Sequence, residues 1–347
     1  MSEAQHVPAI VRVLRQVLRP AKRMSPVLQV YSWYLARKRQ REQELLAEST
    51  GHVVQRWGEV ATAREAMRTG DAPASWLDAP LVQQVVIRPR FGGGDWLSFF
   101  RQRHLTHPVE RGLSLCCGDG YLERMLQDLK ICRCVDGIDA SPEAVQVAQE
   151  RAQREGRTGL RYWVADANRV ELESGSYGAV FAAMGFHHVR RLKHLLKEVR
   201  RSLEPGGFLV VNEYVGPSRF QWTDDQMRLI NDLLGMLPQR LRVQLDDGLV
   251  KHQVLRPTIE EMIRIDPSEA VCSAEIPRLI ARHFDVDARV DYGGTVLYQL
   301  LERIVHNFDP AREEDVALLR LLSFIENEAI RVGKLKSDFA VFVARRR

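Results

Sequence analysis

The chain has 347 residues, of which 45% are hydrophobic and 27% are charged. These proportions are typical of a globular protein that can bury a sizeable core, and one or two domains are expected. No apolar run approaches the ~20 residues of a membrane-spanning helix. Arg12, Arg15 and Arg19 interrupt the apolar residues near the N-terminus, so a secretory signal is not predicted either.

The net charge of +5 belongs to the N-terminal part of the chain. Residues 1–50 hold nine Lys and Arg against four Asp and Glu, which leaves the remaining residues electrically balanced. Apolar residues recur at helical spacing over 7–19 and again over 27–39. We weigh two interpretations of residues 7–41: a helical cap that packs on the rest of the fold, and a peripheral contact with the anionic inner face of a membrane. The balanced remainder argues against nucleic acid as a partner.

The next segments lead into the main domain. Residues 40–70 have a helical pattern, whereas residues 71–94 contain several prolines and three consecutive glycines and predict an irregular bridge. A short helix is expected over 95–105. We therefore predict a basic helical extension over 1–94 and the main domain over 95–347.

The cysteines indicate the compartment. There are five, and no two of them form a C-x-x-C pair. An odd number with two adjacent members, Cys116 and Cys117, favours free thiols in a reducing compartment over disulfides or a zinc site. A reducing compartment implies a cytoplasmic protein. No other metal-ligand spacing occurs, so we expect no bound metal.

One stretch dominates the sequence, a short apolar run that stops at Gly118 and Gly120 and is followed by a helical pattern. This order predicts a strand, a tight turn and a helix over 112–129. Glycine permits a sharp turn and the close approach of a ligand to the backbone. The free N–H groups at the start of the helix would face polar groups of that ligand.

A second strand, over 134–138, ends at Asp139. This carboxylate follows Gly120 by 19 residues. An acid about 20 residues beyond a glycine turn, at the tip of the next strand, can accept hydrogen bonds from the two hydroxyls of a ribose. The turn and Asp139 together therefore predict a nucleoside site.

The turn also narrows the kind of nucleoside. A dinucleotide fingerprint has a third glycine three residues after the second, where this chain has Glu123. No Lys-Ser or Lys-Thr pair follows the turn, so a P-loop is excluded. An adenosine ligand without a phosphate chain remains, and a nicotinamide-dependent oxidoreductase is disfavoured.

Four motifs resemble those of the class I S-adenosylmethionine-dependent methyltransferases. They are Leu113-Ser-Leu-Cys-Cys-Gly-Asp-Gly120, Gly137-Ile-Asp-Ala-Ser-Pro142, Val164-Ala-Asp-Ala-Asn168 and Glu204-Pro-Gly-Gly207. Ser114 stands where that family usually has an acid, and Cys116 replaces the usual first glycine. The resemblance implies S-adenosyl-L-methionine as the cofactor. The residues that it implies for cofactor binding are Ser114, Cys116, Cys117, Gly118, Gly120, Asp139, Ala140, Asp166, Ala167, Asn168 and Met184.

Further patterns complete the fold. Strands are predicted over 160–165, 177–183, 208–213, 284–291 and 339–343, with helices after Ser141 and over 190–203. This alternation predicts an α/β, Rossmann-like fold with a seven-stranded doubly wound sheet, and the resemblance implies that the last strand pair is antiparallel. Helical insertions over 223–280 and 295–332 are expected to act as lids over a substrate pocket.

The residues expected to act in catalysis follow the fourth and fifth strands. The resemblance places the cofactor's sulfonium at the tip of the fourth strand, where His187 and His188 lie, and Glu213 lies on the neighbouring strand. Histidine is the usual base for a hydroxyl proton near neutral pH, and we favour His187. The residues expected to bind substrate are Tyr214, Arg219, Trp222, Arg256 and Tyr292.

A wider pattern, which includes Asn212-Glu-Tyr-Val-Gly-Pro217 and Asp266-Pro-Ser-Glu-Ala270, resembles bacterial methyltransferases that accompany glycosyltransferases in surface-glycan or natural-product pathways. The leading interpretation is an O-methyltransferase that acts on a small-molecule or glycan hydroxyl. The alternative is a non-catalytic S-adenosylmethionine-binding or scaffold protein, since Ser114 and Cys116 depart from the usual motif. The acceptor and the methylated atom stay open, as does the oligomeric state, for which a homodimer is one option.

Overall fold

The computed structural model describes Gly51, Val54 and residues 75–346. Contacts between Cα atoms divide the chain into two units, Met1–Gly51 and His52–Arg347. The second unit carries the fold and the candidate site.

Two predictions lie outside the described residues. They are the basic segment over 7–41, with its interpretations as a cap or a membrane contact, and the helix over 40–70 apart from Gly51 and Val54. In the part of the chain that the structure covers, no helix is both long enough and apolar enough to cross a membrane.

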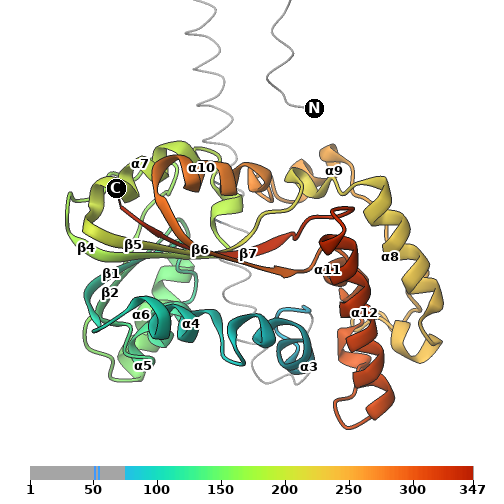
Figure 1. Cartoon of the computed structure of the whole chain (residues 1–347). Helices are drawn as coiled ribbons and strands as arrows, with labels where there is room; N and C mark the ends of the chain where they lie inside the picture. The colour runs from blue at the N-terminus through green and yellow to red at the C-terminus, as the bar shows by residue number, and fades with distance from the viewer. Residues whose placement is uncertain (1–50, 52–53, 55–74, 347) are drawn as a thin grey trace, which may run out of the picture. The chain divides into compact units, whose positions relative to one another are not determined.

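Seven strands form one sheet in the order β3-β2-β1-β4-β5-β7-β6 (Figure 1). Neighbouring strands are parallel except at β7, which runs antiparallel to both β5 and β6. The bounds are β1 Val109–Leu115, β2 Cys132–Asp139, β3 Leu160–Val164, β4 Tyr177–Ala183, β5 Leu203–Tyr214, β6 Asp285–Gly293 and β7 Phe339–Arg345. The predicted seven-stranded doubly wound sheet is therefore confirmed, together with its antiparallel last strand pair.

Helices cover both faces of the sheet (Figure 1). One face carries α4 (Trp96–His104), α5 (Tyr121–Asp128) and α6 (Pro142–Arg154), and the other carries α7 (Leu192–Ser202) and α10 (Ile276–His283). Because both faces are covered, the inner strands β4 and β7 are buried along most of their length. The packed sheet fixes the loops at the carboxyl ends of its parallel strands, where folds of this kind bind ligands.

The helix cap predicted at Ser141 is present. The Ser141 hydroxyl accepts a hydrogen bond from the Ala144 N–H at 3.1 Å, and Pro142 begins α6. At α4, the Asp95 carboxylate accepts from the Ser98 N–H at 2.8 Å. These side chains satisfy backbone donors that the helices leave unpaired at their first turns.

Residues 76–91 differ from the predicted irregular bridge. They form the short helical turns α3 (Pro80–Val82), η2 (Gln83–Ile87) and η3 (Arg88–Phe91). Trp76 is completely buried and stacks on Tyr292, with 6.4 Å between the ring centroids. Tertiary packing of the apolar side chains here outweighs the local effect of the prolines. This part of the predicted extension, 1–94, therefore packs within the main domain.

Both predicted insertions are helical. The first contains α8 (Asp224–Met236), α9 (Ile259–Ile265) and α10, and the second contains α11 (Leu297–Leu301) and α12 (Glu313–Arg331). Helix α11 packs beside both α8 and α12 (Figure 1). The buried Glu326 carboxylate on α12 accepts from the Gly294 N–H at 2.9 Å and the Val296 N–H at 2.6 Å. This carboxylate anchors the second insertion to the end of β6.

Glu123, on α5, is completely buried, and so is Ser114 on β1. Burial raises the pKa of the Glu123 carboxyl group to about 7, against the opposing effect of the Ser114 hydroxyl. An acidic side chain is therefore present beneath the glycine turn, but it comes from α5 and not from position 114.

Glu123→Gln should change how stability depends on pH. The folded-state pKa of about 7 lies above the ordinary pKa of 4.5 for a solvated glutamate, which we take for the unfolded chain. Between pH 4.5 and pH 7 the folded protein therefore keeps a proton that the unfolded chain releases. The free energy of unfolding of the wild type falls by about 3 kcal/mol as the pH rises through this range. Thermal unfolding of Glu123→Gln should lack this dependence, and the variant should be more stable than the wild type above pH 7.

The exposed Glu171 provides the control, because Glu171→Gln removes a carboxyl group that is already solvated. Its unfolding should keep the wild-type pH dependence. If Glu123→Gln also keeps that dependence, the buried carboxyl group does not titrate in this window and the account of its environment is wrong.

Candidate functional site

A cavity of about 290 Å³ lies at the carboxyl ends of the parallel strands. Its position agrees with the general rule for ligand sites in doubly wound sheets. Its wall contains nine of the eleven residues predicted to bind the cofactor: Cys116, Cys117, Gly118, Asp139, Ala140, Asp166, Ala167, Asn168 and Met184. Ser114 and Gly120 are not part of the wall that the described residues form: Ser114 is buried in β1, and Gly120 is in the turn before α5.

Two residues at the strand ends have strained backbone conformations. Cys116 has a φ of 55° and Met184 has a φ of 54°, in the left-handed region that side chains other than glycine rarely adopt. Both residues line the cavity. A Cβ atom at Gly185 would lie 2.6 Å from that of Cys116, so the turns after β1 and β4 interlock closely. Backbone strain of this kind concentrates at functional sites.

Gly120 is required by the packing of the turn. Its φ is 76°, and a Cβ atom there would lie 2.8 Å from Tyr162 Oη and 2.9 Å from Ala148 Cβ. Only glycine fits this conformation at this separation without movement of the neighbours. Gly120 therefore serves the close approach of the turn to β3 and α6.

Asp139 is fixed at the end of β2 by backbone hydrogen bonds. One carboxylate oxygen accepts from the Gly118 N–H at 3.0 Å and the other from the Ser141 N–H at 2.9 Å. Burial raises the pKa of this carboxyl group, and the two backbone N–H groups oppose that effect. Each carboxylate oxygen can accept a further hydrogen bond. The two oxygens therefore fit the adjacent hydroxyls of a ribose.

Asp166 and Asn168 form another part of the cavity wall. The Asp166 carboxylate accepts from the Asn168 N–H at 2.8 Å and from its side-chain amide at 3.0 Å. The side-chain oxygen Oδ1 of Asn168 accepts from the Arg191 N–H at 2.9 Å, just before α7. These contacts hold the loop after β3 in place. The structure thus brings Asp166, which is predicted to bind the cofactor, to the same cavity as Asp139.

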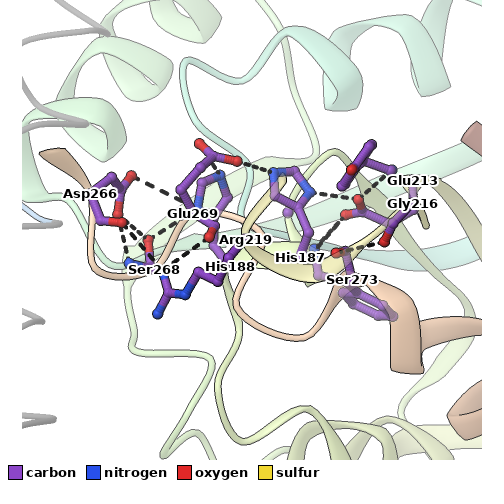
Figure 2. A network of polar contacts seen from close by, with 12 residues as sticks. His187, His188, Glu213, Gly216, Arg219, Asp266, Ser268, Glu269 and Ser273 are labelled. Carbon is purple, nitrogen blue, oxygen red and sulfur yellow. Dashed lines mark hydrogen bonds and ion pairs between the residues drawn. The ribbon is translucent and has the colours of Figure 1, made fainter. Parts of the chain in front are cut away.

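A polar network surrounds His187 and His188 (Figure 2), and it adjoins the cavity because His188 is part of the cavity wall. The fully buried Glu213 carboxylate accepts from the Phe186 N–H at 2.5 Å and from the Tyr214 N–H at 2.7 Å. It also lies 2.6 Å from His187 Nδ1. Burial lowers the pKa of His187, but Glu213 and Glu269 outweigh it and raise this pKa to about 9. Glu213 therefore positions the turn that carries both histidines.

His188 is the histidine that lines the cavity. Its Nδ1 lies 3.0 Å from Ser268 Oγ, and the Ser268 hydroxyl donates to the Asp266 carboxylate at 2.6 Å. The Glu269 carboxylate lies 3.5 Å from His187 Nε2 and 4.0 Å from His188 Nε2. Figure 2 shows Glu269 on the side of His187 that is opposite Glu213.

Ser268 and Glu269 are not among the site residues predicted from the sequence. Ser268 lies 80 residues beyond His188 along the chain, in the first insertion. The Asp266-Pro-Ser-Glu-Ala270 motif was the available signal, but sequence alone did not indicate that it meets the histidines.

Three of the residues predicted to bind substrate belong to the core. Tyr214 and Tyr292 are 2% exposed and Trp222 is 3% exposed. Arg256 forms an ion pair with Asp224, 2.5 Å apart. Within the part of the chain that the structure describes, none of these four lines the cavity, and their substrate roles stay predictions.

Arg219, the fifth predicted substrate residue, holds the loop of the first insertion. It donates to the backbone carbonyl oxygens of Pro267 at 2.7 Å and of Glu269 at 3.0 Å. Its own φ is 57°, a left-handed conformation. Arg219 therefore fixes the backbone that presents Ser268 and Glu269 to the histidines.

Comparison with known proteins gives relatives for part of the chain. It is 26% identical over 141 residues to the demethylmenaquinone methyltransferase of Leptospira interrogans, a match that covers 37% of this chain and 56% of the relative. It is 26% identical over 184 residues to the 2-phytyl-1,4-naphtoquinone methyltransferase of Trichormus variabilis, a match that covers 49% of this chain and 80% of that relative. The chain thus spans little more than half of the first relative.

A solved structure of an S-adenosylmethionine-dependent methyltransferase from Mesorhizobium loti aligns with a TM-score of 0.44 at 16% identity. The alignment covers 72% of this chain and 97% of that one.

A family model described as a methyltransferase domain matches residues 113–211. The matched segment begins in β1 and ends in β5, so it contains the glycine turn, Asp139, Asp166 and both histidines. Residues 113–211 are therefore similar to a methyltransferase domain, and they include every residue predicted to bind the cofactor.

Proposed function

We propose that the chain is an enzyme that transfers the methyl group of S-adenosyl-L-methionine to a hydroxyl oxygen of a small molecule or glycan. One observation carries this proposal: the cavity that contains Asp139 and Asp166 is also lined by His188, which belongs to a buried histidine–carboxylate network. Methylation of a hydroxyl requires a nucleoside site and a proton-accepting site next to each other.

The cofactor supplies a methyl group that is already activated on a sulfonium. Residues of the chain would bind and orient the cofactor: Asp139 would accept hydrogen bonds from the ribose hydroxyls, and Asp166 would accept one from the adenine amino group. Methyl transfer is a direct displacement, so most of the rate acceleration comes from holding donor and acceptor close and in line. Two fixed carboxylates at the nucleoside provide that orientation.

The hydroxyl proton leaves on the side of the cavity that carries His188. Glu213 is completely buried and is engaged by backbone N–H groups. His187 is 5% exposed and is held by Glu213. We therefore assign the contact with the acceptor to His188, in place of the sequence-based preference for His187, and a positioning role to His187 and Glu213.

The names of the curated relatives favour a second acceptor class. Those proteins are named as methyltransferases of demethylmenaquinone and of 2-phytyl-1,4-naphtoquinone. A quinone-type acceptor would also present oxygen atoms to the polar network. The third option, a non-catalytic scaffold, gives no role to the network beside the cavity and is the least favoured.

The proposal extends to the surroundings of the enzyme. A cytoplasmic enzyme with a basic arm over 7–41 would reach a lipid-linked acceptor by contact with the inner face of the membrane. A place in a surface-glycan or natural-product pathway, and assembly as a homodimer, belong to the same proposal.

Replacement of Asp139 tests the cofactor site. Asp139→Ala removes the carboxylate that accepts the ribose hydroxyls, and hydrogen bonds to a charged group contribute roughly 1.5–3 kcal/mol. The dissociation constant for S-adenosylhomocysteine, measured by calorimetric titration, should rise on the order of tenfold to a hundredfold. Asp232→Ala, at an exposed position of α8, is the control and should bind as the wild type does. Wild-type affinity in a folded Asp139→Ala protein would sink the assignment.

Replacement of His188 tests the catalytic side of the cavity. His188→Ala should lower kcat by roughly 10²–10⁴-fold, while affinity for S-adenosylhomocysteine changes far less than in Asp139→Ala. Turnover is measured as release of S-adenosylhomocysteine, with naphthoquinols and glycan hydroxyls as the two acceptor classes.

The exposed His252 gives a matched control, since His252→Ala removes an imidazole from the first insertion without touching the network. It should retain wild-type turnover. Normal turnover in His188→Ala would refute the assignment of His188. A wild-type protein that binds S-adenosylhomocysteine but methylates neither acceptor class would support the scaffold.

A further inference from the structure

The geometry points to a metal site: we infer that His187, His188 and Glu269 bind a divalent transition-metal ion beside the cofactor cavity. The site itself stands on the described contacts alone. Its role in catalysis, as the group that binds the acceptor oxygen, rests on the proposed function.

The three side chains converge on one point. His187 Nε2 lies 3.5 Å from one Glu269 oxygen, and His188 Nε2 lies 4.0 Å from the other. One ligand atom from each residue lies within 4.8 Å of the other two. A tetrahedral ion held at about 2.1 Å by each ligand separates the ligand atoms by roughly 3.4 Å. Small side-chain movements therefore suffice to close the site around an ion.

The partner of His187 on its other side fixes the tautomer. Glu213 accepts backbone hydrogen bonds from Phe186 and Tyr214, so its carboxylate acts as an acceptor. His187 Nδ1, 2.6 Å away, therefore carries the hydrogen and donates it to Glu213. In the neutral imidazole, the lone pair is then on Nε2, on the side of Glu269. A carboxylate behind a histidine in this way is the usual support of a metal ligand.

His188 is oriented by a second chain of hydrogen bonds. The Ser268 hydroxyl donates to Asp266 at 2.6 Å, so its oxygen is available to accept from His188 Nδ1 at 3.0 Å. The neutral imidazole of His188 then also has its lone pair on Nε2. Both histidines are thus set in the same tautomer by partners that are not themselves ligands (Figure 2).

When both imidazoles are neutral, their lone pairs and the carboxylate favour a cation between them. The raised pKa of His187 reflects a proton in that place, and a metal ion would replace that proton. Two neutral imidazoles and one carboxylate carry a single negative charge, which a divalent ion more than balances. Two nitrogens and one oxygen suit first-row transition metals such as zinc, iron or cobalt better than magnesium or calcium, which prefer oxygen ligands.

The position of Glu269 is set by the fold. Arg219 donates to the Glu269 backbone carbonyl oxygen at 3.0 Å, and the Val271 N–H donates to the His187 carbonyl oxygen at 2.9 Å. The insertion is therefore tied to the turn that carries the histidines. The side chains of His188 and Glu269 are 13% and 24% exposed, so an ion can reach them from solvent.

The ion gives the acceptor a defined place. A hydroxyl oxygen bound to the metal loses its proton to solvent more readily, because the ion lowers the hydroxyl pKa. The oxygen then attacks the methyl carbon, a C–O bond forms, and the C–S bond breaks with its electron pair left on sulfur. In this scheme His187 and His188 are ligands, the acceptor oxygen contacts the ion that His188 helps to hold instead of the imidazole itself, and the hydroxyl proton passes to solvent.

The test is titration of the chelator-treated full chain with Zn²⁺ by calorimetry and with Co²⁺ by visible absorption. We expect one zinc site and the absorption of protein-bound cobalt in the wild type. His188→Ala and Glu269→Gln should weaken zinc binding on the order of a hundredfold or more, since loss of a supporting partner alone costs roughly 10–100-fold. Glu269→Gln keeps the size of the side chain and guards against misfolding of the alanine variant. His252→Ala should bind zinc as the wild type does.

Equal zinc binding in the wild type and in both variants, or a wild type that binds none, would overturn the metal site and leave a proton as the cation between these groups. Turnover that survives chelation, with S-adenosylhomocysteine still bound, would overturn the catalytic role of the ion but leave the proposed function standing. A wild-type protein that does not bind S-adenosylhomocysteine would overturn the proposed function. The zinc titration would still decide whether the metal site exists.

Discussion

The buried carboxylate of Glu213 is the interaction on which the candidate site depends. It lies at the end of β5 and accepts backbone hydrogen bonds from Phe186 in the turn after β4 and from Tyr214 in its own strand. A buried charge is costly unless it is fully paired. The pairing therefore ties the ends of two neighbouring strands together, and it fixes the ring of His187 between Glu213 and Glu269.

The remaining parts of the site are arranged around Glu213 and the turn that it holds. The parallel strands bring Asp139 and Asp166 to one cavity, and the strained turns at Cys116 and Met184 shape the cavity between them. The first insertion then adds Glu269 on the other side of the histidines. The core fold thus provides the proposed nucleoside site by backbone geometry, whereas Glu269 and Ser268 on the proposed acceptor side come from the first insertion. Such an arrangement allows the acceptor to differ between proteins that share the cofactor.

Local patterns in the sequence were sufficient to predict the core of the fold. The glycine turn, Asp139 and the cap at Ser141 each depend on neighbours within a few residues or on a fixed spacing, so they were predictable. Residues 76–91 and Glu269 were not, because their places depend on packing against segments far along the chain. The expectation of no metal rested on local ligand spacing, and spacing alone does not indicate that Glu269 lies beside His187 and His188.

A crystal structure of the protein with S-adenosylhomocysteine would test the central claim most directly. The account predicts that the ribose hydroxyls contact Asp139, that the adenine lies at Asp166, and that the sulfur points to the part of the cavity lined by His188. A nucleoside bound elsewhere, or one whose sulfur points away from His188, would contradict it.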